Sequence, residues 1–140
     1  MMFAVLRLRG TVKVSNDVID TLAMLRLSRK MHCVLINESP SFNGMIRKVK
    51  DYITWGPIND ETLKLLVAKR GRMPGNKRLK EGDAEKIVEV IKSGKKPVIV
   101  PVFRLSPPSK GFKHSIKHSY PKGELGFRGE EINKLLMRMI

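Results

Sequence analysis

The stretch HCVLINESPSFNGMIRKVKDYITWGPI, residues 32–58, contains two short apolar runs separated by an amphipathic segment. The runs HCVLINE and YITWGPI are typical of β-strands, because each is apolar and bounded by turn-forming residues. The segment between them opens near Pro40, a residue favoured in the first turn of a helix, and repeats its apolar residues at helical spacing. This stretch therefore predicts a strand, a helix and a second strand.

Upstream residues extend the same alternation. FAVLRLRG (residues 3–10) predicts a strand that ends at Gly10 and carries arginines on its polar face. Ser15 and the two polar residues after it supply N-cap chemistry for a helix in VIDTLAMLRLSRK (residues 18–30). The order strand, helix, strand, helix, strand predicts an α+β fold with a ferredoxin-like βαβαβ core. We expect a three-stranded antiparallel sheet with both helices on one face and the other face free for a partner.

Beyond Pro57 the pattern changes to helices and irregular segments. We divide the chain into a core, residues 1–58, and an extension, residues 59–140. The extension comprises helices in 59–71 and 82–94, a basic loop at 70–80, an extended segment at 95–105, a basic arm at 106–128 and a C-terminal helix at 129–140. Because Pro97 and Pro101 each remove a hydrogen-bond donor, the extended segment should be an edge strand or irregular.

The charge balance points to a polyanionic partner. The chain has 28 Lys and Arg against 13 Asp and Glu, which gives a formal net charge of +15. Self-repulsion of this size opposes compaction unless a partner neutralises it. A membrane is disfavoured, because the apolar opening MMFAVL is interrupted at Arg7 and is too short to span a bilayer. The single Cys33 excludes an internal disulfide and fits a reducing, cytoplasmic setting.

The arm contains a repeat, FKHSIKHSY, residues 112–120. A spacing of four puts Phe112, Ile116 and Tyr120 on one side, whether the chain is helical or extended. An apolar row against the protein and a basic row facing outward would suit an arm that RNA orders. Phe112 and Tyr120 could stack on bases or anchor the arm to the protein. The alternative interpretation is a solvated flexible loop.

Basic residues fall into three candidate RNA contact surfaces, in which Lys and Arg would bind phosphates. The first comprises Arg7, Arg9, Arg26, Arg29, Lys30, His32, Arg47, Lys48 and Lys50. The second is the basic loop, with Arg70, Arg72, Asn76, Lys77 and Arg78. The third is the arm, with Lys110, Lys113, His114, Lys117, His118 and Lys122.

We predict no catalytic, metal or cofactor site. Adjacent residues on a strand face opposite sides, so His32 and Cys33 are not expected to act as a dyad. His114 and His118 have the spacing of two zinc ligands but lack further Cys or His ligands. The paired carboxylates sit where the first turns of helices favour acidic groups. Trp55 and Cys33 are interpreted as packing residues.

The N-terminal part of the chain resembles the large-subunit ribosomal protein family called L-thirty in bacteria and L-seven in eukaryotes. The match runs through TLAMLRLSRKMHCVLINESPSFNGMIRKVKDYI, residues 21–53. The residues that fit the family pattern are Thr21, Leu22, Leu25, Leu27, His32, Gly44, Met45, Ile46, Lys48 and Val49. The later segments LVAKRG, FRLSPPSKG and GELGFRGEEINKLLMRM resemble the longer archaeal and eukaryotic form. The absence of a basic extension before Met1 favours the archaeal type, and Asn43 replaces an arginine that bacterial relatives often have.

The resemblance implies a structural protein of the large ribosomal subunit that binds large-subunit (23S-type) rRNA. It also implies proximity to 5S rRNA and to neighbouring ribosomal proteins, with no membrane or small-molecule partner. Two alternatives from other classes stay open: a general nucleic-acid coating protein, and an RNA-processing enzyme on a ferredoxin-like scaffold. The second would need an acid-base or metal constellation that the sequence does not provide.

Overall fold

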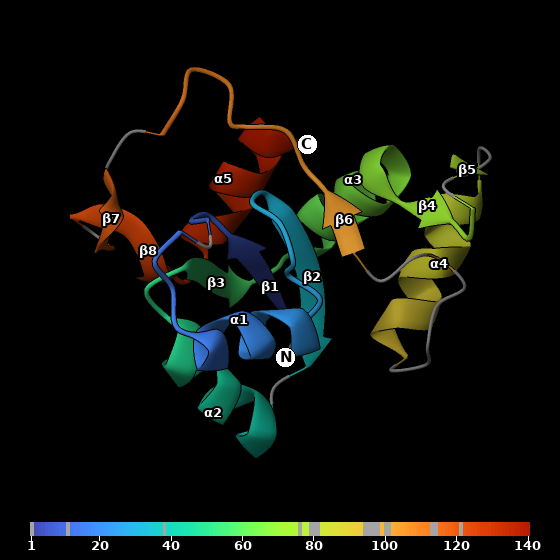
Figure 1. Ribbon diagram of the computed structural model, residues 1–140. Coiled ribbons are helices and arrows are strands. Elements are labelled where there is room, and N and C mark those ends of the chain that lie inside the picture. The colour runs from blue at the N-terminus through green and yellow to red at the C-terminus, as the bar shows by residue number, and fades with distance from the viewer. Residues whose placement is uncertain are drawn as a thin grey trace.

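The structure is a computed structural model that describes residues 2–10, 12–37, 39–75, 77–78, 82–93, 99, 102–112, 115–120 and 122–140, with the backbone alone at 115–117. The helices and strands form a mixed α+β fold (Figure 1). In chain order they are β1 (Met2–Arg7), α1 (Asn16–Met24), β2 (His32–Asn37), α2 (Pro40–Val49), β3 (Ile53–Pro57), α3 (Asp60–Arg70), β4 (Arg72–Met73), β5 (Lys77–Arg78), α4 (Asp83–Lys92), β6 (Val102–Arg104), β7 (Ser115–Ser119), β8 (Gly123–Phe127) and α5 (Glu131–Met139).

The central sheet has the strand order β6–β2–β1–β3–β8–β7. β1 lies between β2 and β3 and is antiparallel to both, with Leu6 opposite Cys33 on one side and Thr54 on the other. β2 and β3 are therefore parallel to each other, and α2 joins them across β1. This arrangement confirms the predicted ferredoxin-like α+β core, within a sheet that has more than three strands.

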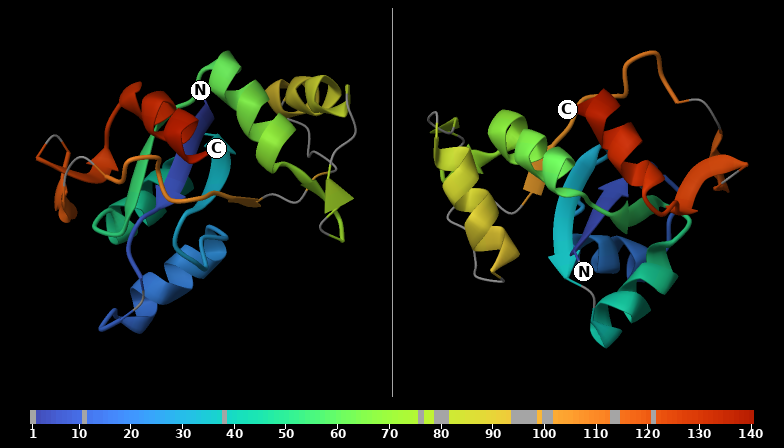
Figure 2. Two further views of the ribbon diagram at one scale, coloured as in Figure 1. Left: turned by 90° about the horizontal axis from the view of Figure 1, so that it is seen from above. Right: turned by 180° about the vertical axis from the view of Figure 1, so that it is seen from behind.

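One face of the sheet is covered by α1 and α2, as expected (Figure 2). Val5 of β1 and Ile53 of β3 are fully buried there beneath apolar side chains of both helices. The chain enters α2 through Ser39, whose Oγ accepts a hydrogen bond of 3.1 Å from the Phe42 N–H. This cap and the proline after it start the helix where the sequence predicts it.

The opposite face is not free, so this expectation was wrong. α3 and α5 pack on it, and α4 packs in turn against α3 (Figure 2). β1 is the reason: its residues Ala4 and Leu6 are fully buried on this face, and Leu8, just beyond its end, is buried with them. A strand that is apolar on both faces needs cover on both. The extension supplies the second layer.

The extension also adds strands to the sheet. β6 pairs antiparallel with β2 at the sheet edge, which confirms the edge position predicted for this segment. Pro97 and Pro101 lie outside the described residues. The arm was expected to lack strands, but it contains β7 and β8, and β8 runs parallel to β3 with Phe127 opposite Trp55. Short strands such as β8 are held by pairing with distant residues, which local sequence pattern does not reveal.

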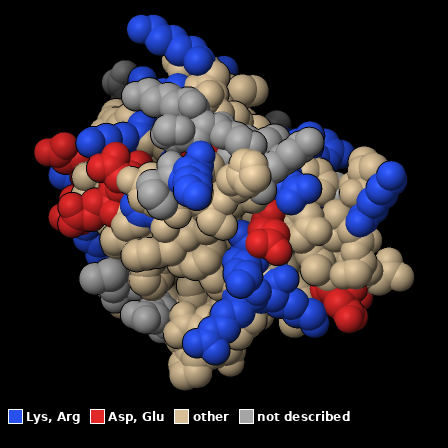
Figure 3. All heavy atoms as spheres, turned by 90° about the vertical axis from the view of Figure 1, so that its left-hand side faces the viewer, with Lys and Arg blue, Asp and Glu red and all other residues tan. Residues whose placement is uncertain are grey.

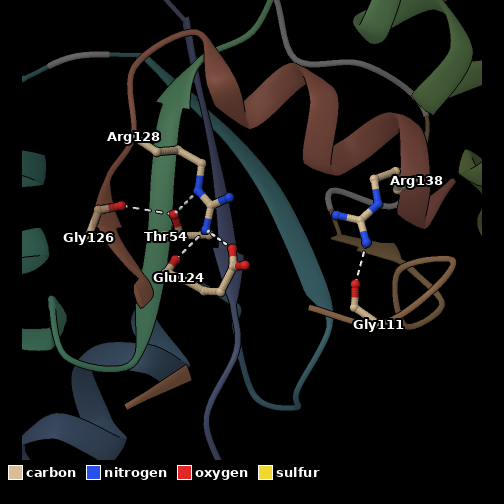
Figure 4. A network of polar contacts seen from close by, with 6 residues as sticks. All are labelled: Thr54, Gly111, Glu124, Gly126, Arg128 and Arg138. Atoms are coloured by element: carbon tan, nitrogen blue, oxygen red, sulfur yellow. Dashed lines mark hydrogen bonds and ion pairs between the residues drawn. The ribbon is translucent and has the colours of Figure 1, made fainter. Parts of the chain in front are cut away.

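A buried polar network fixes β8 against β3 (Figure 4). The Arg128 guanidinium donates from Nε to the Thr54 Oγ1 at 2.7 Å and contacts the Glu124 carboxylate at 2.7 Å. Thr54 Oγ1 in turn donates to the Gly126 carbonyl at 2.9 Å. The Arg128 and Glu124 side chains are only 6% and 5% exposed. Because both charges have left water, each depends on the other for compensation.

Replacing one partner of this ion pair should destabilise the fold. We expect Glu124→Gln to lower the free energy of unfolding by about 3 kcal/mol, since it leaves the Arg128 charge buried without a carboxylate. Urea denaturation of the two proteins measures the difference. The matched control is Glu130→Gln at an exposed position, which should change the value by less than about 0.5 kcal/mol. Equal losses in both variants would contradict this role of the ion pair.

Candidate nucleic-acid interface

The turn between α1 and β2 presents three exposed basic side chains, Arg26, Arg29 and Lys30. Arg26 has a φ of 64°, in the left-handed region that residues other than glycine rarely adopt. A hydrogen bond of 2.8 Å from the Leu27 N–H to the Leu22 carbonyl closes the helix in this conformation. The helix end therefore places an exposed guanidinium where glycine is the usual residue.

Arg7 does not lie on this surface, contrary to expectation. Its side chain faces the α1 and α2 side of the sheet and the residue is only 2% exposed. Nη1 donates to the Leu27 carbonyl at 2.7 Å and Nε donates to the Arg9 carbonyl at 2.9 Å. Burial lowers the pKa of Arg7, although a guanidinium remains charged at neutral pH. Arg7 therefore holds the turn after α1 in place rather than facing a partner.

His32 is half-buried among cationic groups. It lies opposite Arg104 in the β2–β6 pairing, and Arg29 and Arg7 are also close enough to act on it. Burial first, and then the repulsion of these three arginines, lowers the pKa of His32 below its usual value. Its Nδ1 is buried without a hydrogen-bond partner in the described part of the chain. His32 is thus a neutral imidazole within a cationic surface.

The outer side of α2 adds three exposed cations, Arg47, Lys48 and Lys50, to the first surface. Arg9 is only partly available, because its guanidinium lies 5.2 Å from the centre of the Tyr52 ring. Its Nη1 also donates a long hydrogen bond of 3.4 Å to a backbone carbonyl of the same loop. Because α1 and α2 pack side by side on one face of the sheet, the exposed cations of α2 lie on the same helical layer as α1.

The basic loop is a small hairpin in which β4 and β5 pair antiparallel. Lys77 and Arg78 are exposed on β5. Arg70 and Arg72 are half-buried: the Arg70 guanidinium donates to the Ser106 Oγ at 2.8 Å, and that of Arg72 donates to nearby backbone carbonyls. Asn76, predicted as a contact, lies outside the described residues.

The arm places Lys110, His118 and Lys122 on the surface. Lys113 and His114 lie outside the described residues, as does the Lys117 side chain. Phe112 packs against the α3–α5 core, which supports its interpretation as an anchor. The loop before it is held by Arg138, which donates to the Ser109 carbonyl at 2.8 Å and to the Gly111 carbonyl (Figure 4).

The three surfaces do not merge into one patch. In Figure 1 the β4–β5 hairpin lies at the right of the molecule and β7 and β8 at the left. Figure 3 shows the left-hand face, where Lys and Arg side chains project at several places and acidic side chains lie at the left edge, near the centre and at the lower right. The basic groups therefore face several directions.

Two surface features were missed by the sequence analysis. Phe127 is 55% exposed and its ring lies 6.1 Å from that of Trp55. The cause is Gly126, whose φ of 88° interrupts the strand alternation, so Leu125 is buried while Phe127 is not. In the sequence, the only sign that Phe127 would be exposed was Gly126 inside an apolar run.

Arg104 was also missed by the sequence analysis. It lies opposite His32 in the sheet, although the two residues are far apart in the sequence.

Cys33 is fully buried, and burial raises the pKa of its thiol to about 12. The side chain is thus protonated at neutral pH and unsuited to nucleophilic attack, because the thiolate is the reactive form. No helix in the described ranges is long and apolar enough to cross a membrane.

The burial of His32 and the arginines around it should lower its pKa by an amount that can be measured. Its pKa, followed by NMR, should lie below 6.5, and Arg104→Gln should raise it by removing one repelling charge. The unfolded chain binds a proton at higher pH than the folded chain does. Stability should therefore fall as the pH drops below about 6.5 and level off below the folded pKa. A His32 pKa at or above 6.5, or no rise in the Arg104→Gln variant, would contradict the account.

Comparisons with known proteins show which family this chain resembles. A family model described as Ribosomal protein L30p/L7e matches residues 3–53. The large ribosomal subunit protein uL30 of Archaeoglobus fulgidus is 48% identical, over 99% of this chain and 99% of its own length. The proteins of the same name from Methanosphaera stadtmanae and Staphylothermus marinus are each 44% identical, over 99% of this chain and 100% and 98% of their own lengths. The chain therefore belongs to the uL30 family of large ribosomal subunit proteins.

Proposed function

We propose that this protein is a structural constituent of the large ribosomal subunit, in the cytoplasm, and that it binds and stabilises large-subunit rRNA. The observation that carries the proposal is the similarity to uL30 proteins along the whole chain. The net charge of +15 and the exposed basic side chains on several sides of the molecule support it. A protein embedded in folded RNA needs such contacts in several directions.

Binding would rest mainly on phosphate neutralisation. Each Lys or Arg that meets a phosphate releases counterions and contributes affinity that does not depend on base sequence. Folded rRNA is A-form and is recognised mostly through its shape, its 2′-hydroxyls and its unpaired bases. The protein's rigid sheet would fix the spacing of its basic groups, and thus which RNA shape they match.

The proposed contacts are the predicted basic residues that the structure leaves exposed. These are Arg26, Arg29, Lys30, Arg47, Lys48, Lys50, Lys77, Arg78, Lys110, His118 and Lys122. Arg9, His32, Arg70 and Arg72 are half-buried and would contribute partly. Arg7 is left out, because its guanidinium is committed to backbone carbonyls. We retain Asn76, Lys113, His114 and Lys117 as contacts on the sequence pattern alone.

We extend the proposal to a position near 5S rRNA, in contact with neighbouring large-subunit proteins. The support is the family resemblance. The exposed ring of Phe127, beside the half-buried Trp55, offers a surface on which an unpaired base could stack. We further propose that the protein has no enzymatic role. Its buried, protonated Cys33 is unsuited to act as a nucleophile, which supports this for cysteine chemistry. The uL30 family is a family of structural ribosomal proteins.

Binding to deproteinised large-subunit rRNA from the source organism tests both the function and the contacts. We expect Lys77→Gln combined with Arg78→Gln to weaken binding and to reduce the slope of log affinity against log salt. The reduction should be about 0.7 to 0.9 for each phosphate that the variant no longer neutralises. Filter binding across a series of salt concentrations measures it.

The matched control combines Lys64→Gln with Lys86→Gln, which removes the same charge from exposed helical positions outside the proposed contacts. It should reduce the slope less. Duplex DNA of equal length is the competitor, and we expect rRNA to bind at least about a thousandfold more tightly at equal salt. Equal affinity for rRNA and DNA would replace the ribosomal proposal with a general coating protein.

A further inference from the structure

Gly44 lies inside α2, where a glycine needs an explanation. The residue is exposed and its backbone is helical. Glycine weakens a helix relative to alanine, because its backbone loses more conformational freedom on folding. A side chain at this position would be tolerated, since a Cβ added to Gly44 would meet no atom within 4 Å.

The fold itself does not require glycine at this position. At Gly56, by contrast, an added Cβ would clash with the carbonyl of Gly129, so close packing excludes any side chain. Gly44 has neither this crowding nor a positive φ. Apart from weakening the helix, its lack of a side chain therefore matters only for what approaches α2 from outside.

Gly44 also lies on the solvent-exposed face of α2, opposite the core. Phe42 and Ile46 point into the core beneath α2, and at 100° for each residue Gly44 lies about 200° round the helix from Phe42. Arg47 and Lys48 follow at the i+3 and i+4 positions, which are its neighbours on the helix surface. Both are exposed, and neither forms an ion pair with another described residue.

We propose that the bare backbone at Gly44 is the point where an rRNA sugar-phosphate strand lies directly against α2, with Arg47 and Lys48, one turn further along the helix, on its phosphates. This inference rests on the proposed rRNA-binding function and names one of its contact points. Charge complementarity identifies the occupant, because two exposed cations that form no ion pair with a described residue lie on the next turn beside the bare backbone. On the preceding turn the exposed neighbours of Gly44 are Ser41 and Pro40, and the adjacent Asn43 is also exposed. The polar Ser41 and Asn43 do not suit an apolar protein surface.

The test separates stability from binding. We expect Gly44→Ala to raise the thermal midpoint of the free protein by about 3 °C, because alanine favours the helix. We expect Gly44→Gln to weaken binding to the deproteinised large-subunit rRNA about tenfold, the effect of removing one charge-assisted hydrogen bond to a phosphate. Thermal denaturation and filter binding at fixed salt measure the two effects.

The matched control is Ala68→Gln, which adds a side chain of the same type to an exposed position of α3. Its affinity should stay unchanged. Unchanged affinity in Gly44→Gln, or an equal loss in Ala68→Gln, would overturn the inference. The double variant Arg47→Gln with Lys48→Gln shows whether the inference alone fails or the proposed function fails with it. If that variant loses rRNA affinity and Gly44→Gln does not, the inference is overturned and the proposed function stands. If the wild-type protein itself does not bind rRNA, the proposed function is overturned.

Discussion

The rest of the structure depends on the burial of β1 on both faces. Val5 packs beneath α1 and α2, whereas Ala4 and Leu6 pack beneath α3 and α5. Backbone pairing on both sides adds β2 and β3, and these two strands recruit β6 and β8 from the extension. One strand near the N-terminus thus organises two layers of helices and a sheet that draws residues from the whole chain.

Arg7 connects this core to the surface. It belongs to β1, yet its guanidinium reaches the Leu27 and Arg9 carbonyls, and its own carbonyl accepts from the Met31 N–H at 2.8 Å. The turn that exposes Arg26, Arg29 and Lys30 is therefore tied to the central strand. Holding this turn in one conformation matters for RNA binding, because a fixed spacing of cations can match one arrangement of phosphates better than others.

Sequence periodicity predicted all five helices, because each follows an apolar repeat. The predicted end of the first helix at residue 30 was wrong, since α1 ends at Met24 and the chain turns at Arg26 with a positive φ. It did not predict the second helical layer, since which elements cover a face depends on tertiary packing. β8 was missed because Gly126 breaks the alternation of buried and exposed residues along it. Arg7 was wrongly predicted to be exposed, because the alternation pattern of a strand does not show whether an arginine faces solvent or the interior. Charge located the basic surfaces but could not distinguish free cations from those bonded to carbonyls, such as Arg72.

The most direct test of this account is sedimentation of the tagged protein from a native lysate through a sucrose gradient, at several salt concentrations and after RNase treatment. The account predicts migration with the large ribosomal subunit that survives moderate salt and disappears when the RNA is digested. Protein at the top of the gradient, or protein bound to RNA of every size and released by modest salt, would contradict it.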